Sequence, residues 1–459
     1  MSVGIVGAGI TGLALTHYLA ERDVDVATFE AASEPGGAID SRRVDGRVLE
    51  CGPQRVRLTD EISALVDDLG LREDLLVADD DLPLYVYVDG RLREVPRSIP
   101  AFLRTDLLTW PAKVRLLAEP LTGDGDPEET AAELFTRKFG AETYHNLIGP
   151  LFGGIYGSDP ARMPAKHALS GVLRMEAKHG NLLKPALKRV RSGGDTPPPI
   201  SFLDGMQQLP EALYAAHDDR IALDTAVESV RADGDGYVLE TPAESVRVDD
   251  VVVTVRADRA ADLLADLDAD SATALDELDY NSLVYVHLLA DVDREGFGYQ
   301  VRRDEPLQTL GVSWNDSLFD DASAARPVGV EDGSASAPDR PPRQTGREGV
   351  YTVFLGGMDH PEAMEWSETR QGRVAAEEFE DVMGASADVL NVTPIPDAFP
   401  AWDVSWSALD RVSLPEGVTL ATNYTARMGV PSRVRQAKRL AGELAERADS
   451  RATPASVSD

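Results

Sequence analysis

Three glycines near the N-terminus, Gly7, Gly9 and Gly12, stand at the spacing of a dinucleotide-binding loop. An apolar run at 3–6 precedes them and an apolar-periodic segment begins at Ile10, so the pattern predicts a strand, a tight turn and a helix. In such a loop the first glycine permits the turn, the second lets the backbone approach a pyrophosphate, and the third lets helix and strand pack closely. The helix N-terminus would offer its unpaired N–H groups to the phosphates.

A carboxylate follows at the distance that a ribose contact requires. Glu30 closes a second predicted strand, 25–30, and stands 18 residues after Gly12, the last glycine of the loop, near the spacing of about 20 that is expected for this contact. The alternative is a glycine turn in an unrelated α/β protein. Such a turn would not require a preceding strand, a following helix and an acidic residue at the end of a second strand, all of which are predicted here. The sequence therefore predicts a Rossmann-type dinucleotide site in an α/β fold.

The length and composition narrow the class of protein. The chain has 459 residues, enough for two or three domains and a large core. No uninterrupted apolar run reaches the roughly 18 residues of a membrane span, and a strand begins at Val3 without the basic region of a secretory signal. We therefore expect a cytoplasmic protein, or one that contacts the inner face of the cell membrane peripherally. A single cysteine, Cys51, excludes an intramolecular disulfide and a cysteine-cluster metal site, and we interpret it as a small buried residue.

The chain is strongly acidic, with 79 acidic against 45 basic residues and a net charge of −34. Nucleic acid is not an expected partner, because neutralising phosphates needs a basic face. The acidic residues are scattered, as at 79–81 and 377–378, rather than gathered in one tail. This distribution indicates a solvated acidic shell of the kind that halophilic proteins use in concentrated salt.

Two further glycine motifs follow Glu30: Gly36-Gly37 and Gly52-Pro53. Together with the N-terminal loop, this series resembles the flavin amine oxidase superfamily. The resemblance implies that the dinucleotide is FAD rather than NAD.

The order of predicted elements indicates a fold assembled from separated segments. A Rossmann-type FAD-binding domain, a second mixed-sheet substrate-binding domain and a helical insertion account for that order. The segments are 1–80, 200–275 and 395–447 for the FAD-binding domain, 81–98 and 276–394 for the substrate-binding domain, and 99–199 for the insertion. We also expect a helix over 56–75, a strand over 84–88 with a hairpin turn at Asp89-Gly90, a mobile surface loop over 320–349, a last helix over 433–447 and a disordered tail over 448–459.

Five further segments resemble the FAD-dependent protoporphyrinogen oxidase family and its coproporphyrinogen-oxidising relatives. In order and spacing they span nearly the whole chain. They are Gly149–Pro160, Phe202–Pro210, Gly296–Val301 followed by Leu310–Val312 and Ser317–Phe319, Phe354–Gly357, and Met428–Pro431.

This resemblance implies a set of FAD-binding residues. Val227 would touch the adenine, Trp406 would lie near the cofactor, and the backbone of Met428, Gly429 and Val430 would meet the isoalloxazine. A helix N-terminus suits that last position, since it places partial positive charge where reduced flavin is negative. The remaining implied residues are Gly7, Ala8, Gly9, Ile10, Thr11, Gly12, Glu30, Ala31, Gly36, Gly37, Ala38, Gly52, Pro53, Gln54 and Arg55.

For the substrate, the resemblance points to Phe297 and Gly298, an aromatic face with a glycine that would allow a broad macrocycle to approach. A polycarboxylate substrate also needs cations, and Arg57 and Arg93 are our candidates, beside Arg55. No catalytic side chain is identified, because the flavin itself would carry the chemistry.

Two positions depart from the family pattern. Where members commonly have an arginine just before the aromatic strand 84–87, this chain has Leu84. Where the closing motif typically continues Asp-Cys-Ile, this chain reads Ser432-Arg433-Val434. We expect FAD binding to tolerate both changes. The motifs determine the identity of the substrate less firmly than that of the cofactor.

The reading that the resemblance favours is FAD-dependent oxidation of protoporphyrinogen IX to protoporphyrin IX, with oxygen as the expected acceptor, in porphyrin and haem biosynthesis. Three alternatives stay open: oxidation of coproporphyrinogen III, a flavin amine oxidase or carotenoid desaturase, and a flavin-binding protein without turnover. The residues show neither a Ser-His-Asp set nor metal-ligand spacing. They leave the oligomeric state and contact with a membrane open.

Overall fold

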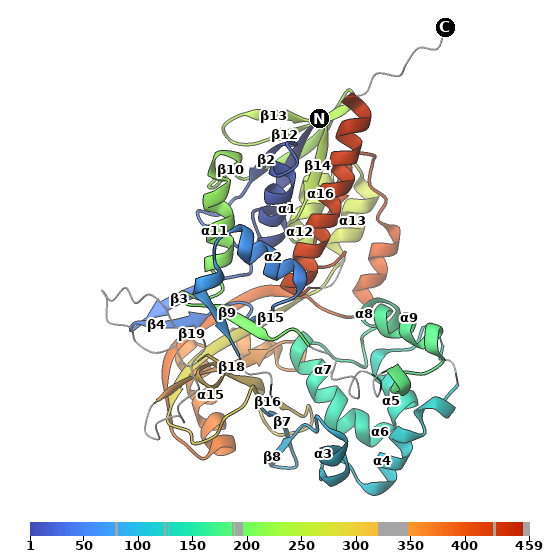
Figure 1. Ribbon diagram of the computed structural model, residues 1–459, viewed down its shortest axis with the longest axis vertical. Helices are drawn as coiled ribbons and strands as arrows, with labels where there is room; N and C mark the ends of the chain where they lie inside the picture. Colours follow the sequence, from blue (N-terminus) through green and yellow to red (C-terminus); the bar gives the residue numbers. More distant parts are fainter. Residues whose placement is uncertain are drawn as a thin grey trace.

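The computed structural model describes residues 1–78, 81–123, 125–126, 128–185, 188, 196–319, 348–425 and 428–452. Its parts are a nucleotide-binding unit built on a parallel sheet, a large mixed sheet, and a group of helices beside that sheet (Figure 1). Segments from the beginning, middle and end of the chain build the parallel sheet, as the order of sequence motifs predicted.

Five parallel strands form the first sheet, in the order β10-β2-β1-β14-β20. Apolar side chains project from both of its faces, because both faces are covered. Val3 and Ile5 pack under helices α1 and α16, while Val251 and Val253 pack against α12 and α13 on the other side. The bounds are β1 Ser2–Val6, β2 Asp25–Phe29, β10 Ile221–Ala222, β14 Asp250–Val253, β20 Val418–Leu420, α1 Ile10–Ala20, α12 Ala257–Leu264, α13 Ala269–Asp276 and α16 Val430–Ala452.

The carboxyl edge of this sheet is where the glycine loop and the start of the last helix meet. Val6, Val253 and Leu420 are in register, so the chain leaves three strands at the same edge. Helices α1 and α16 both begin there and run side by side (Figure 1). Ligands of open parallel sheets bind at this edge.

Seven strands form the mixed sheet, in the order β19-β15-β18-β17-β16-β7-β8. Helix α15 covers it through Phe379, which packs among the buried residues of the sheet. The predicted hairpin at Asp89-Gly90 is confirmed, since it joins β7 to β8. The bounds are β7 Leu84–Val88, β8 Arg91–Glu94, β15 Tyr280–Ala290, β16 Gly298–Val301, β17 Thr309–Trp314, β18 Gly349–Gly356, β19 Ala387–Pro400 and α15 Glu368–Met383.

The remaining elements are the predicted helical segment and small sheets that join the units. A capping box on Thr130 and Glu133 begins α5, one of the insertion helices. The helices are α3 Ile99–Arg104, α4 Trp110–Leu117, α5 Ala131–Phe139, α6 Ala141–Thr143, the π-helix Tyr144–Ile148, α7 Gly149–Tyr156, α8 Ala165–Ala168 and α9 Ser170–His179. The other elements are β3 Ser41–Val44, β4 Arg47–Glu50, β5 Val56–Arg57, β6 Leu75–Val77, β9 Pro199–Phe202, α2 Asp60–Asp68, α11 Gln208–Ala216, and the meander β11 Ser229–Asp233, β12 Gly236–Glu240 and β13 Ser245–Val248.

Three expectations about elements need correction. The segment 56–75 is not one helix, because both its ends pair as strands with β9. Between these strands lie α2 and a short 3-10 helix at Arg72–Asp74. Helix α16 continues to Ala452, so the first five residues of the expected disordered tail are helical, and 453–459 lie outside the described residues. Of the mobile loop expected over 320–349, residues 320–347 lie outside the described residues, and Gly349 belongs to β18.

Candidate functional site

The glycine loop has the geometry that its sequence predicted. Gly7 has a φ of +103°, a region that favours glycine, and its N–H donates to the carbonyl of Phe29 at 2.8 Å. A Cβ on Gly12 would lie 1.9 Å from the carbonyl oxygen of Gly7, so only glycine allows helix α1 to pack here. A Cβ on Gly9, in contrast, would meet nothing closer than 3.9 Å. The space over Gly9 is therefore open to a ligand.

Glu30 stands beside this loop. Its carboxylate accepts from the N–H of Ala8 at 2.6 Å and from the N–H of Ala32 at 3.0 Å. Gly9 also forms a β-bridge with Gly36, which holds the second glycine motif against the first. The structure thus brings the carboxylate and the paired glycines to the carboxyl edge of the sheet.

A large cavity begins where this cradle ends and extends between the two sheets and the helices. Its volume is about 1790 Å³, whereas a pocket for one small ligand measures roughly 300–1,000 Å³. It therefore has room for a flavin ring and a second molecule. The predicted site residues that line it are Gly37, Ala38, Gly52, Pro53, Gln54, Arg55, Arg57, Phe297, Gly298, Trp406, Met428, Gly429 and Val430.

The other predicted cofactor residues lie outside the lining of this cavity: Gly7, Ala8, Gly9, Ile10, Thr11, Gly12, Glu30, Ala31, Gly36 and Val227. The glycine loop nevertheless adjoins the cavity. Gly37 lines the cavity, and a Cβ on Gly37 would lie only 3.1 Å from the Cα of Gly9. Val227 follows Thr225, whose N–H donates to the carbonyl of Glu30 at 2.7 Å. The two sets thus form one path from Glu30 to the cavity.

One end of the cavity combines an aromatic ring with cations. The Cζ of Arg55 lies 5.5 Å from the centroid of the Phe297 ring, and its Nη1 donates to Ser313 Oγ at 2.9 Å. Within the described parts of the chain, no carboxylate pairs with Arg55. Burial, with the Arg57 guanidinium beside it, lowers the pKa of Arg55 to about 10, so it stays charged at neutral pH. This end of the cavity can bind an anion attached to an apolar body.

Another part of the cavity wall comes from the helices and from the segment before β20. Trp402 and Trp406 stack with ring centroids 4.0 Å apart, and Trp406 Nε1 donates to the carbonyl of Ala401 at 2.6 Å. Lys166 and Arg174 bring two further cations to the lining. Sequence reasoning missed both, because nothing in a helical pattern marks which side chains will face a distant sheet.

Two predicted substrate residues do not have the expected geometry. Arg93 does not line the cavity; it pairs with Asp89 at 3.2 Å and with Asp106 at 3.8 Å. Gly298 lines the cavity, but a Cβ there would lie 2.0 Å from the carbonyl oxygen of Val312 in β17. The glycine is therefore required by the neighbouring strand, and not to make room for a macrocycle.

Other cavity residues bear on the departures from the family pattern. Leu84 lines the cavity, so this departure removes a cation from the wall. Arg42, Arg55 and Arg57 line the cavity too, and Arg42 pairs with Asp40 at 2.9 Å. Cys51 is buried as expected, and burial raises the pKa of its thiol.

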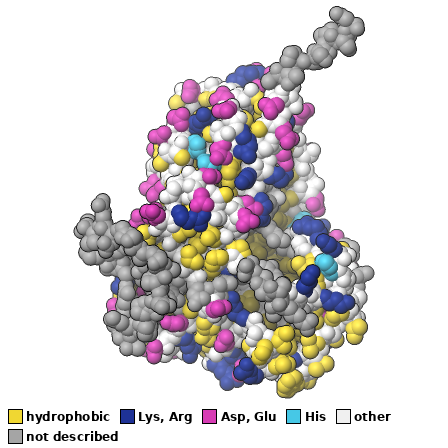
Figure 2. Space-filling model, in the orientation of Figure 1, with side chains coloured by type: hydrophobic (Ala, Val, Ile, Leu, Met, Phe, Trp, Pro, Cys, Tyr) yellow, Lys and Arg dark blue, Asp and Glu magenta, His cyan; other side chains and the backbone are white. Residues whose placement is uncertain are grey.

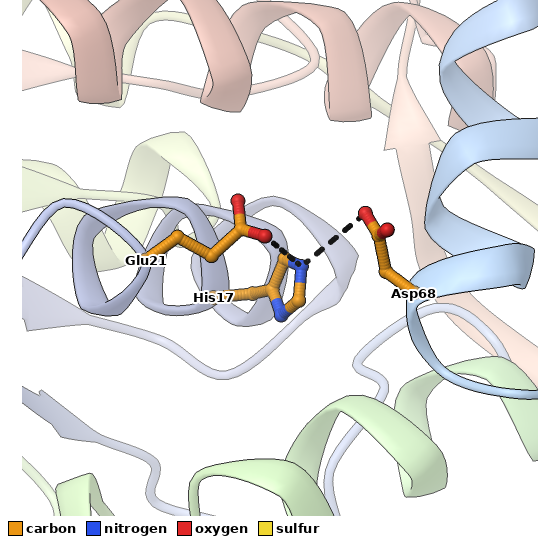
Figure 3. A group of neighbouring side chains, drawn as sticks. All are labelled: His17, Glu21 and Asp68. Carbon is orange, nitrogen blue, oxygen red and sulfur yellow. Dashed lines mark ion pairs between the residues drawn. The ribbon is translucent and has the colours of Figure 1, made fainter.

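A separate polar group lies on the nucleotide-binding unit and not in the cavity lining. His17 Nε2 is 3.7 Å from Glu21 Oε1 and 3.9 Å from Asp68 Oδ2 (Figure 3). Its Nδ1 lies 3.0 Å from Nε2 of His217, and burial lowers the pKa of His17. These contacts link α1 to α2 and to the turn after α11. The sequence did not show this group, because Asp68 and His217 come from other elements.

The residues present suit FAD. The open space over Gly9, the carboxylate of Glu30 and the N-terminus of α1 would hold the dinucleotide. Met428, Gly429 and Val430, at the start of α16, would place the partial positive charge of a helix N-terminus at the flavin ring.

Comparison with known proteins supports a flavin cofactor. The family model described as flavin containing amine oxidoreductase matches residues 10–444. The chain is 30% identical over 361 residues to the chloroplastic protoporphyrinogen oxidase of Oryza sativa subsp. japonica, covering 70% of this chain and 67% of that one. It is 27% identical over 355 residues to the coproporphyrinogen III oxidase of Bacillus subtilis (strain 168), covering 70% and 74%.

The fold is shared with solved structures. A crystal structure of an Exiguobacterium sp. protein assigned as a protoporphyrinogen oxidase has a TM-score of 0.77 at 22% identity, covering 97% of this chain and 99% of that one. With its glycine cradle, the adjoining cavity and these matches, the chain belongs to the flavin containing amine oxidoreductases, in the branch of the protoporphyrinogen and coproporphyrinogen oxidases.

Proposed function

We propose that this FAD-dependent oxidoreductase oxidises protoporphyrinogen IX to protoporphyrin IX. The observation that carries the proposal is the pairing of Arg55 with Phe297 at the end of a cavity that has room for two molecules. A porphyrinogen is a broad, mostly apolar ring with carboxylate side chains. It would place its ring against Phe297 and a propionate at Arg55, which has no acidic partner among the described residues.

The residues of this chain would bind and orient the substrate, while bound FAD accepts the hydrogen removed from it. Gln54 is fixed for such a role, since its amide nitrogen donates to the carbonyl of Glu50 and its Oε1 accepts from Asn315. The cavity walls, including Trp402, Trp406 and Tyr285, would keep water from the reacting ring.

Coproporphyrinogen III is the second candidate substrate, and it carries four propionates where protoporphyrinogen IX carries two. The lining contains five cationic side chains, Arg42, Arg55, Arg57, Lys166 and Arg174, of which Arg42 pairs with Asp40 at 2.9 Å and Lys166 lies 3.8 Å from Asp410. Such a set could serve either substrate. The test is turnover of each porphyrinogen by the purified protein in molar salt, followed by porphyrin fluorescence. Preference for coproporphyrinogen III would replace our first choice. Oxidation of amines, or no turnover of any substrate, would overturn the proposal.

We also propose that the helical insertion rests on a membrane surface. Large apolar side chains stand exposed on α3, α4 and the turn that follows, and Figure 2 shows apolar side chains gathered at this lower end of the molecule. The described residues include no helix that is long and apolar enough to span a bilayer. The exposed residues, which we call the apolar tip, are Ile99, Leu103, Trp110, Val114, Leu117 and Leu121.

A further inference from the structure

A buried imidazole on the nucleotide-binding unit faces two carboxylates without a hydrogen bond to either. His17 is 6% exposed, and its Nε2 is buried without a hydrogen-bond partner. This nitrogen lies 3.7 Å from Glu21 Oε1 and 3.9 Å from Asp68 Oδ2 (Figure 3). Both distances exceed the reach of a hydrogen bond. The nitrogen and the two oxygens therefore face one another across a space that no hydrogen bond closes.

The separation of these three atoms suits a metal ion, since all of them lie within 4.8 Å of one another. Zinc holds nitrogen and oxygen ligands at about 2.0–2.2 Å, so two ligands at a tetrahedral angle lie roughly 3.3–3.6 Å apart. The side chains of Glu21 and Asp68 are each 45% exposed, so small rotations can bring their oxygens to that spacing. An ion would reach Nε2 of His17 from the solvent, between these two exposed carboxylates.

The other ring nitrogen has the partner that a metal-binding histidine needs. His17 Nδ1 lies 3.0 Å from Nε2 of His217. A metal ligand must offer a lone pair at Nε2, so the ring proton would be on Nδ1 and would be donated to His217. In metal sites such a second hydrogen bond fixes the tautomer and the orientation of the ligating ring. His217 thus holds the imidazole of His17 in place from behind.

Helix ends supply a field that favours a cation here. His17 is in the last turn of α1, and Glu21 is the C-cap of that helix. Asp68 ends α2, and His217 is the C-cap of α11. The C-terminus of a helix carries partial negative charge, and the two carboxylates add two full charges that one divalent ion neutralises. Arg22 lies 3.9 Å from the other oxygen of Glu21, Oε2, and so does not occupy Oε1.

We propose that His17, Glu21 and Asp68 bind a divalent metal ion of the zinc class, through His17 Nε2 and one carboxylate oxygen from each acid. The imidazole nitrogen favours Zn²⁺ over Mg²⁺ and Ca²⁺, which take oxygen ligands. Three protein ligands leave the fourth position of a tetrahedral zinc to water. The three residues lie outside the lining of the large cavity. The role of the ion is therefore structural: it fastens α1, the helix that follows the glycine loop, to α2.

The test uses the untagged, FAD-loaded full-length protein, dialysed against a chelator and then titrated with ZnCl₂ in a calorimeter. We expect saturable binding of one Zn²⁺ per chain, and a Tm that rises with the Zn²⁺ concentration, because an ion that binds only the folded state stabilises it. Asp68→Asn removes an exposed carboxylate, so the protein should fold and bind Zn²⁺ at least about tenfold more weakly. Asp67→Asn is the matched control: Asp67 precedes Asp68 in α2 and pairs with Arg72, so the Kd for Zn²⁺ should not change.

His217→Ala leaves the three ligands in place and removes the partner of His17 Nδ1, so it should weaken Zn²⁺ binding about ten- to a hundredfold. Glu21→Gln removes the second exposed carboxylate and serves as the test if Asp68→Asn does not fold. The absence of saturable Zn²⁺ binding would overturn the proposal, and so would a Kd that is the same in wild type, Asp68→Asn and Glu21→Gln. Equal affinity for Mg²⁺ would also overturn it, because it would show an all-oxygen site without His17.

Discussion

The guanidinium of Arg55 stacks over the ring of Phe297, with 5.5 Å between Cζ and the ring centroid. The two residues come from different units: Arg55 follows the Gly52-Pro53 motif, and Phe297 directly precedes β16 of the mixed sheet. Their contact joins the cofactor side of the cavity to the side that we assign to the substrate. Ser313 completes it by accepting a hydrogen bond from Arg55 Nη1.

We expect Arg55→Met to lower kcat/KM for a porphyrinogen about ten- to a hundredfold, because a charge-assisted contact with a propionate is lost. Arg93→Met is the control, since Arg93 is an arginine outside the cavity. Steady-state kinetics with both porphyrinogens measure the effect, and flavin absorbance shows whether FAD is retained. Equal kinetics for wild type and Arg55→Met, or an equal loss in Arg93→Met, would contradict a substrate contact at Arg55.

Two glycines of the N-terminal loop should respond differently to substitution. Gly9→Val should abolish FAD binding while the apoprotein stays folded, because a Cβ at Gly9 meets open space that the pyrophosphate would occupy. Gly12→Ala should instead lower the Tm, since its Cβ would clash with the carbonyl of Gly7. Flavin absorbance and thermal unfolding separate the two effects. Full flavin content in a folded Gly9→Val protein would show that the dinucleotide binds elsewhere.

Glu50 predicts a dependence of stability on pH. Burial raises its pKa to about 7, although Ser41 Oγ and the N–H of Met206 donate to the carboxylate. The folded protein therefore keeps a proton that the unfolded chain releases near pH 4.5, and stability falls as the pH rises from about 4.5 to about 7. In Glu50→Gln this loss, up to about 3 kcal/mol, should be absent.

Urea unfolding at pH 5 and at pH 8 measures the difference. The free energy of unfolding of Glu50→Gln, relative to wild type, should increase between the two pH values. Parallel behaviour of the two proteins would mean that Glu50 is ionised in the folded state throughout this range.

The apolar tip predicts binding to lipid. Two of its bulky residues, Trp110 and Leu121, are 64% and 87% exposed. Trp110→Ser with Leu121→Ser should reduce co-sedimentation with phosphatidylcholine–phosphatidylglycerol vesicles at least tenfold, since burying each side chain contributes about 1.5–3 kcal/mol. Val389→Ser with Val404→Ser, which changes exposed apolar residues elsewhere, is the control. If wild type and both double variants sediment alike, the tip does not bind this membrane.

Local patterns predicted much of the nucleotide-binding unit. The glycine spacing, the two strands and Glu30 form a continuous segment, so their relation is fixed by the chain itself. The same holds for the hairpin at Asp89-Gly90. The prediction of a single helix over 56–75 was wrong for the opposite reason. The strands at the two ends of this segment are stabilised by β9, which lies far along the chain and gives no local signal.

At the end of the cavity that we assign to the substrate, the local sequence also does not predict tertiary contacts. Arg55 and Arg93 look alike in the sequence, and only the tertiary arrangement places one in the cavity and the other beside Asp89 and Asp106. For Gly298, the sequence indicated that a side chain is missing, but not which way a side chain would point. In the structure a Cβ at this position would point at the carbonyl of Val312. Consequently Gly298→Ala is expected to lower stability and is a poor test of substrate binding.

The most direct test of the central claim is a single turnover without oxygen. The FAD-loaded protein is mixed anaerobically with protoporphyrinogen IX or coproporphyrinogen III, and the visible flavin absorbance is followed together with porphyrin fluorescence. We expect the flavin absorbance to bleach without oxygen, at a rate that falls in Arg55→Met and not in Arg93→Met. Porphyrin fluorescence should appear only after oxygen is admitted, because the six-electron oxidation of a porphyrinogen needs three successive two-electron reductions of the flavin. A flavin that stays oxidised in the presence of both porphyrinogens would contradict the account.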